Sequence, residues 1–478
     1  MDKLSKLLNK LRNLPKGVKV SVAFFLANII TSGIGYIVTP IYTRMLPSDI
    51  VGQASVFLTW VDLFGIIAMF CLSYGVFNNG MVDYPDQRDD YSFSMLILSN
   101  IITAGFTLII VALYPFIGGF LNMDLPLVLL MCGLFFVQPA YKFWTVKQRY
   151  EWKYKSTVLW TVFCAFASPT VAILCIHFSD QNKLYARLFG AELTLIAIYL
   201  GFYFYLAFRN KWKINTSYWK AALLFNIPLI PHYLSTFLLG SSNKLLIEKI
   251  VGESEVAYYN VVHSVAVLVT IFWNSINSSL VPYTYEKCKE NDYKSISKVM
   301  SPILTMLATV CVGVMMFAPE VVAIMAPPEY REAIYIIPSI IGGVFFQVQY
   351  FIYANIVYYH KKPRYVMYAS VTSVAINLVL GYLLISTFGY LAAGYATLIS
   401  YFVQASLDYI AMRKVVKEEV YNMRYIGILS VVVIAVAVLS TLVYDFIFVR
   451  YGIIAVILVV CFLLRSKIIQ AVKNLKFK

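Results

Sequence analysis

Two acidic side chains lie deep inside long apolar stretches of the sequence. Asp62 sits near the middle of one stretch, beside Trp60, and Glu192 lies within another. An ionised carboxylate at the centre of a bilayer costs at least about 2.5 kcal/mol, so a membrane protein that keeps one is expected to use it. Three uses are open for Asp62 and Glu192: binding a coupling cation such as H⁺ or Na⁺, pairing with a basic side chain, or a hydrogen bond between helices.

Five basic side chains lie within apolar stretches or at their ends. Each either faces a hydrated cavity, where it attracts anions, or reaches the membrane surface with its aliphatic stem in lipid. Arg44 and Lys244 are the leading candidates for a cavity, because each follows the first apolar stretch of one half of a weak internal repeat. The whole set is Arg44, Lys142, Arg187, Lys244 and Lys249.

Neutral polar residues are also frequent in the apolar stretches. They suit a ligand rich in hydroxyl groups, but each is also an ordinary hydrogen bond between helices, worth under about 2 kcal/mol. The candidates for a polar cavity are Asn28, Asn226, His232, His263, Asn274, Gln347 and Asn377. Pro228 and Pro231 each remove a backbone donor, so the stretch 219–242 is the best candidate for a bending helix, with a static kink as the alternative.

The composition indicates which elements hold these residues. Apolar residues make up 60% of the 478 and charged residues 13%, whereas soluble domains carry about 45–50% and about 25%. A spanning helix needs roughly 20 apolar residues, and fourteen such segments fit, from 18–41 to 449–464. The sequence therefore predicts an all-α polytopic membrane protein with fourteen transmembrane helices. A soluble enzyme with a single anchor is excluded.

The repeat and the loops predict the domain organisation. Residues 44–52 resemble residues 249–257 at an offset of 205, which favours two six-helix bundles related as repeats, followed by two C-terminal helices. Asp408 falls near the end of the segment 390–412 and is expected at the membrane interface. The expected parts are an amphipathic helix at 1–17, a bundle at 18–208, a linker at 209–218, a bundle at 219–412, and two helices with a basic tail at 413–478.

Loop charge predicts the orientation. With the N-terminus inside and fourteen alternating spans, 32 of the 39 Lys and Arg residues fall on the inner side. Inner loops of membrane proteins are rich in these residues, so both termini are expected in the cytoplasm. The acidic loop at 83–90 is an exception. The positive-inside bias also accounts for the net charge of +15 without a nucleic-acid partner.

Several chemistries are absent from the sequence. The seven cysteines show no close pairing or metal-ligand spacing, which predicts neither a disulfide framework nor a metal site. There is no GxxxxGK[ST] motif for nucleotide phosphates, no carboxylate cluster and no nucleophile motif. We therefore expect no catalytic residues and no cofactor beyond a coupling cation, H⁺ or Na⁺. A membrane glycosyltransferase or polymerase would need a large outer loop, and the loops are short.

Two segments resemble a known family. Asn377-Leu378, Phe388-Gly389 and the run 392–400 (AAGYATLIS), with Pro228 to His232 and 242–247 (SNKLLI), are similar to the Wzx-like polysaccharide flippases of the MATE-like MOP transporter superfamily. That family commonly has Ser-Asp-Arg where this chain has Ser242-Asn243-Lys244. The positive charge is kept and the acid is lost.

The resemblance implies a fold and a substrate. It implies paired six-helix bundles around a central cavity and a polyprenyl-diphosphate-linked oligosaccharide as cargo, passed from the inner to the outer leaflet by alternating access. The five basic residues would then hold the diphosphate. It also implies a bacterial plasma membrane, contact with membrane lipids, and a polysaccharide polymerase or other assembly proteins as partners. The alternative is a cation-coupled multidrug exporter of the MATE type, which should have an acidic, aromatic pocket.

Overall fold

The computed structural model describes residues 16–179, 181–456 and 459. The expected amphipathic helix at 1–17 and the basic tail therefore lie almost wholly outside the described residues. Over the described ranges the regular structure is helical, with no β-strand, as expected for an all-α chain. Eleven of the described helices are long and apolar enough to cross a membrane.

These eleven helices cover the second to the eleventh expected segments and the thirteenth. The first and twelfth expected segments form the long helices α2 and α16, and only Ile447–Val456 of the fourteenth falls in a described helix. Polytopic membrane character follows from the eleven helices, whereas the count of fourteen spans and the repeat layout remain predictions.

The chain divides into two compact units by its internal contacts. Unit 1 comprises residues 1–46 and 57–234, and unit 2 comprises residues 47–56 and 235–478. The division thus falls inside a helix at residue 234 rather than in the expected linker at 209–218. The chain also passes from one unit to the other within α3 (Ser48–Ala68). The first nine residues of this helix belong to unit 2 and the rest to unit 1.

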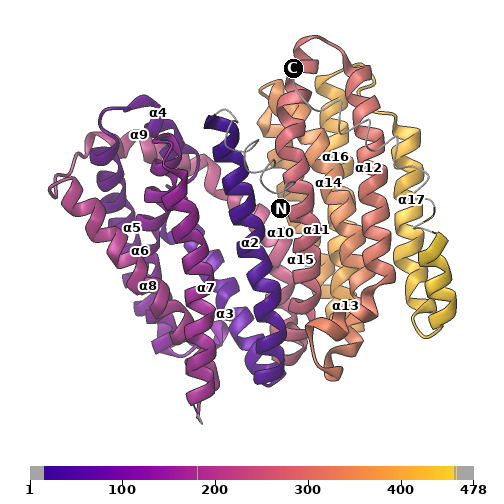
Figure 1. The fold of residues 1–478 in the computed structure, drawn as a ribbon, viewed down its shortest axis with the longest axis horizontal. Helices are drawn as coiled ribbons and strands as arrows, with labels where there is room; N and C mark the ends of the chain where they lie inside the picture. Colours follow the sequence, from indigo (N-terminus) through magenta and orange to yellow (C-terminus); the bar gives the residue numbers. More distant parts are fainter. Residues whose placement is uncertain (1–15, 180, 457–458, 460–478) are drawn as a thin grey trace, which may run out of the picture. The chain divides into compact units, whose positions relative to one another are not determined.

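Unit 1 is a bundle of long helices in which α7 packs against α2 and α8, and α6 packs against α5 and α8 (Figure 1). The short helices α4 and α9 contact each other and α5 at one end of the unit. Its elements besides α3 are α2 (Lys16–Met45), α4 (Gly75–Asp83), α5 (Arg88–Leu121), α6 (Leu125–Tyr150), α7 (Tyr154–Phe178), α8 (Lys183–Arg209), α9 (Ser217–Asn226) and the 3-10 turn η1 (Ile227–Leu229).

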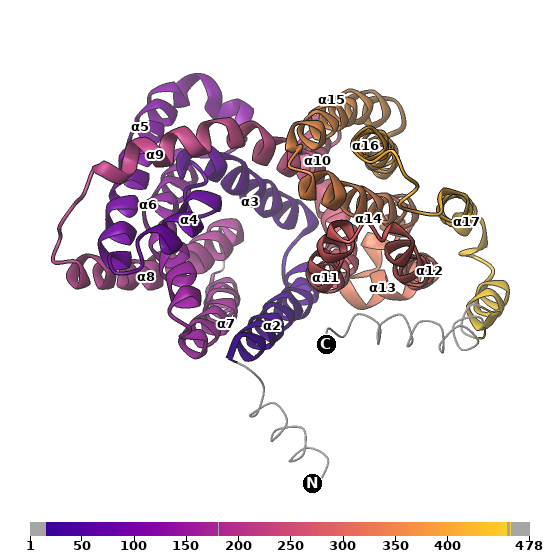
Figure 2. The ribbon, with the colours of Figure 1, turned by 90° about the horizontal axis from the view of Figure 1, so that it is seen from above.

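Unit 2 is built around α14, which packs against α11, α12, α15, α16 and α17 (Figure 2). The apolar part of α14 is 78% buried, so this helix is the core of the unit. Its helices are α10 (Ile230–Ile250), whose first residues belong to unit 1, then α11 (Glu253–Lys289), α12 (Tyr293–Met316), α13 (Ala318–Met325), η2 (Pro328–Tyr335), α14 (Ile337–Tyr359), α15 (Pro363–Phe388), η3 (Tyr390–Ala392), α16 (Ala393–Val415), α17 (Met423–Leu439) and η4 (Ser440–Val443).

The second expected segment, 49–76, is broken in the structure. Helix α3 ends at Ala68, and Phe70 and Cys71 both have left-handed backbone conformations, with φ of 53° and 51°. Backbone carbonyls at the break accept hydrogen bonds from other helices. Thr103 donates to Ala68 O at 3.0 Å, and Asn226 donates to Phe70 O at 3.0 Å. These two bonds satisfy backbone acceptors that a broken helix leaves open.

The acidic loop at 83–90 joins three helices of unit 1. Asp89 forms an ion pair with Lys147 of α6 and a second with Arg209 of α8, Nε to Oδ2 at 2.9 Å. Lys147 is only 1% exposed and also lies 3.5 Å from Glu151. The neighbouring Asp90 accepts from Tyr218 of α9 at 3.3 Å. Asp89, one of the acidic residues that break the positive-inside pattern, therefore neutralises basic side chains.

Candidate functional site

The charged candidates of unit 1 lie close together. Asp62 of α3 is within electrostatic reach of both Lys142 of α6 and Glu192 of α8. Glu192 is 6% exposed, and Lys142 is half-buried. Three helices that are distant in sequence thus bring three of the predicted residues into one group.

Arg187 extends this group to α2. Its guanidinium lies over the ring of Tyr42, 4.4 Å from the ring centroid, and Tyr42 also interacts with Glu192. Arg187 is 9% exposed, and a buried cation over an aromatic face gains about 2 kcal/mol. The group therefore contains two acids, Asp62 and Glu192, and two bases, Lys142 and Arg187, so its formal charge is zero.

The candidates of unit 2 form a second group around Lys244 of α10. Lys244 Nζ donates to Asn260 Oδ1 of α11 at 2.8 Å, and Lys244 interacts with His263 one turn further along α11. The His263 ring lies 3.2 Å from Gly240 O, through Nε2. This group holds a basic residue among neutral polar ones, so it suits an anion better than the group in unit 1 does.

Next to Lys244, two polar side chains of α10 face away into the core of unit 2. Ser242 donates to Asn377 Oδ1 of α15 at 2.9 Å, and Asn243 donates to Thr397 Oγ1 of α16 at 2.8 Å. Asn377 is fully buried, so its amide serves helix packing here rather than an open cavity. Sequence reasoning did not include Thr397, although it lies inside the resemblance segment 392–400.

The two other basic candidates have contacts of their own. Arg44 is exposed at the end of α2 and donates to Pro40 O at 3.1 Å. Lys249 pairs with Glu248 at 2.9 Å, which offsets its charge. Of the five basic residues, the structure thus places Lys142 near Asp62, Arg187 over Tyr42, and Lys244 beside Asn260.

The polar candidates differ in what surrounds them. Gln347 donates to the Tyr401 hydroxyl at 3.1 Å, Asn226 holds the break after α3, and His232 lies beside Tyr233 with ring centroids 5.8 Å apart. Asn274 is exposed, and the side chain of Asn28 lies outside the described part of the structure.

Pro228 falls in η1, and Pro231 is the second residue of α10. The expected helix at 219–242 is therefore interrupted by a 3-10 turn at the prolines, and the hinge stays a prediction.

The expectation for Asp408 concerned its depth in the membrane, and it stays a prediction. The structure adds that its side chain has 0% exposure inside unit 2. Asp408 is the last member of a polar row on α16 that also contains Thr397, Ser400 and Gln404, at helical spacing. That spacing was the available signal, because residues three and four apart share one helix face.

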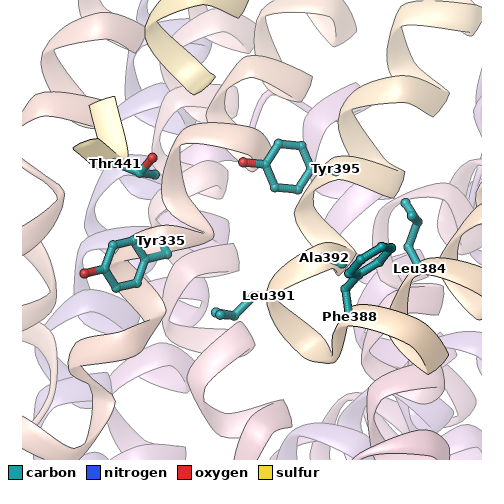
Figure 3. Close-up of a pocket in the computed structure, with 7 residues that line it drawn as sticks. All are labelled: Tyr335, Leu384, Phe388, Leu391, Ala392, Tyr395 and Thr441. Carbon is teal, nitrogen blue, oxygen red and sulfur yellow. The ribbon is translucent and has the colours of Figure 1, made fainter. Parts of the chain in front are cut away.

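A separate pocket of about 400 Å³ lies at one end of unit 2. Its side chains come from η2, α15, η3, α16 and η4 and surround an open space (Figure 3). They are Tyr335, Leu384, Phe388, Leu391, Ala392, Tyr395 and Thr441. None of the predicted site residues lines this pocket, and its lining is mainly apolar.

Comparisons with known proteins agree on the family and the fold. The model of the family described as polysaccharide biosynthesis protein matches residues 18–288. The probable low-salt glycan biosynthesis flippase Agl15 of Haloferax volcanii is 22% identical over 406 residues, which is 81% of this chain and 81% of the relative.

Two solved structures show the same fold. The lipid II flippase MurJ in an inward closed conformation has a TM-score of 0.62 at 12% identity and covers 91% of this chain and 100% of its own. An inward-facing multidrug resistance MATE family transporter of the MOP superfamily has a TM-score of 0.61 at 13% identity, covering 85% of this chain and 98% of its own. The resemblance noted from the sequence is thereby confirmed.

Proposed function

Because this chain belongs to the polysaccharide biosynthesis protein family, we propose that it is a flippase that moves a polyprenyl-diphosphate-linked oligosaccharide from the inner to the outer leaflet. Flippase-type transport is supported by the relative named as a glycan biosynthesis flippase and by the fold shared with a lipid II flippase. Neither relative is named as an enzyme, in keeping with the lack of a catalytic motif. The mechanism we propose is alternating access.

The observation that carries the proposal is the Lys244 group of unit 2. A diphosphate needs a cation that can reach it and neutral donors around it. Lys244 offers the positive charge. Asn260 and His263 beside it are polar side chains without a permanent charge. We further propose a bacterial plasma membrane with both termini cytoplasmic, and a polymerase that consumes the product.

The multidrug exporter stays the second candidate because of unit 1. Its group contains two carboxylates, Asp62 and Glu192, which is the feature that a pocket for cationic drugs needs. However, Lys142 lies within electrostatic reach of Asp62, and Arg187 lies over Tyr42, which interacts with Glu192. Two basic residues thus accompany the two acids in unit 1, whereas Lys244 in unit 2 lies beside neutral polar side chains, which favours an anion.

We predict that Lys244→Ala lowers flipping about ten- to a hundredfold, since a charge-assisted hydrogen bond contributes about 1.5–3 kcal/mol. Lys244→Arg should keep most of the activity because it keeps the charge. The measurement is transport of a fluorescent polyprenyl-diphosphate oligosaccharide into proteoliposomes at matched protein levels. Lys294→Ala is the control, because Lys294 is an exposed lysine of the same unit. Full activity of Lys244→Ala would remove Lys244 from the site.

A further inference from the structure

Helices α15 and α16 face each other with polar side chains that are almost fully buried. On α16 these are Thr397, Ser400, Gln404 and Asp408, and on α15 they are Ser370, Ser373 and Asn377. None of the seven is more than 7% exposed. The two rows meet where Gln404 Nε2 donates to Ser370 Oγ at 3.2 Å. We call these seven residues the polar seam of unit 2.

The hydroxyl groups of the polar seam donate their hydrogens to backbone carbonyls of their own helices. Ser370 donates to Val366 O at 3.0 Å, Ser373 to Ala369 O at 2.8 Å, and Ser400 to Ala396 O at 2.7 Å. Thr397 donates to Ala393 O at 3.3 Å. A hydroxyl has one hydrogen to give, so these four side chains act as acceptors toward the rest of the seam.

The bond to Ser370 also fixes the orientation of Gln404. Since Ser370 has already given its hydrogen to Val366 O, it accepts, and the amide nitrogen of Gln404 must face it. The amide oxygen then points elsewhere. Among the described residues, Gln404 Oε1 is buried without a hydrogen-bond partner.

Asp408 lies one helical turn beyond Gln404 and also has buried oxygens without a hydrogen-bond partner. Both of its carboxyl oxygens are buried, and within the described residues neither has a hydrogen-bond partner. Asp408 and Gln404, four residues apart on one helix face, have Cβ atoms about 5–6 Å apart. The end of the seam thus holds three buried acceptor oxygens that receive no hydrogen bond from the described residues.

The helices packed against α16 provide no counter-charge near Asp408. Asp408 is the only acidic residue in the sequence of α14, α15 and α16, and the only basic residue of α14 and α15 is Arg364, at the exposed start of α15. From α14, the phenol Tyr350 lies within electrostatic reach. On α16 itself, Arg413 is five residues on, about 140° around the helix, and forms no ion pair with Asp408.

An ionised carboxylate in this position would be buried and unpaired, which is strongly unfavourable. A proton removes the charge and also turns one oxygen into a donor, for which Gln404 Oε1 is an unoccupied acceptor one turn away. We propose that Asp408 is a proton-binding site, with the carboxylic acid donating to Gln404 Oε1. A single proton thereby removes the charge of Asp408 and gives Gln404 Oε1 a donor, and the second carboxyl oxygen of Asp408 stays an uncharged acceptor.

The seam also indicates what this proton does. From Asp408 the polar row continues along α16 for about 16 Å to Thr397, which accepts from Asn243, the neighbour of Lys244. Release of the proton would leave a buried charge and disturb the packing of α15 on α16, and with it the contacts of α10. Coupling of the proton to transport rests on the proposed flippase function, whereas the proton site itself does not.

Infrared spectroscopy of the purified full-length protein tests the site without a substrate. We expect the wild type minus Asp408→Asn difference spectrum at pH 7 to contain the C=O stretching band of one protonated carboxylic acid. Asp445→Asn is the control and should give no such band, since Asp445 is 71% exposed and an exposed Asp ionises near pH 4. Other protonated acids cancel in both subtractions.

Three further results distinguish a proton site from a sodium site and test its coupling to transport. Gln404→Leu should shift the Asp408 band, because the accepting oxygen is lost. Replacing sodium by choline should leave the band unchanged. A missing band at pH 7, or a band that grows when sodium is removed, would overturn the proton site and indicate an ionised carboxylate or a sodium site. A band with no effect of Asp408→Asn on flipping would retain the site and reject its coupling role.

Discussion

Replacing Gly52 by alanine is expected to destabilise the protein by about 3 kcal/mol, the upper end of the range for overpacking. A Cβ atom built on Gly52 would lie 1.7 Å from the backbone oxygen of Glu253, the first residue of α11. The obstacle is backbone rather than the end of a flexible side chain, so the two helices must separate. Thermal unfolding of the purified protein in detergent measures the effect.

Two side-chain hydrogen bonds join α3 and α11 at the same ends that meet at Gly52. Gln53 donates to Glu253 Oε2 at 2.5 Å, and Ser48 donates to Ser254 at 3.3 Å. Gly427→Ala is the matched control in unit 2, since nothing lies within 4 Å of a Cβ there. Alanine in a helix should stabilise by up to about 1 kcal/mol. Equal melting temperatures of the two variants would show that α3 and α11 are not packed as described.

The second large effect is expected for Asp89→Ala. This change removes the partner of Lys147, which is 1% exposed, and of Arg209 in one step. Removing one partner of a buried ion pair costs about 3–5 kcal/mol because a buried charge is left behind. We expect about 3 kcal/mol here, since Glu151 stays 3.5 Å from Lys147 and Asp89 is itself partly exposed.

The measurement is again the melting temperature, with Asp86→Ala as control. Asp86 is an exposed residue of the same acidic loop, and surface changes of this kind stay within about 0.5 kcal/mol. The double variant Asp89→Ala/Lys147→Met should recover most of the loss, because the buried charge is then gone. If Asp89→Ala melts like Asp86→Ala, the ion pairs do not hold α5, α6 and α8 together.

The sequence predicts the membrane helices well because apolar length is a local property. The segments 91–117 and 333–358 reappear as α5 and α14 with shifts of a few residues. The break after α3 was not predictable in this way. Phe70 and Cys71 carry no helix-breaking signal, and their conformation depends on Thr103 and Asn226, which are distant in sequence.

The candidate site, too, could be predicted only in part from the sequence. Charge within an apolar stretch identified Asp62, Glu192 and Lys142 from the sequence, but their grouping depends on how three helices pack. The grouping of acids and bases in unit 1 and the polar surroundings of Lys244 in unit 2 therefore come from the structure. For Asp408, the sequence analysis considered only the distance from the segment end, and the burial of the polar row on its helix face comes from the structure.

The central claim is the substrate, and deletion of the gene in its own host tests it most directly. Lipids are extracted, and polyprenyl-diphosphate oligosaccharides on the inner leaflet are measured together with surface polysaccharide. The flippase account predicts that the lipid-linked oligosaccharide accumulates while surface polysaccharide disappears, and that Lys244→Arg restores both and Lys244→Ala restores neither. Unchanged polysaccharide together with new sensitivity to cationic drugs would contradict it and favour the exporter.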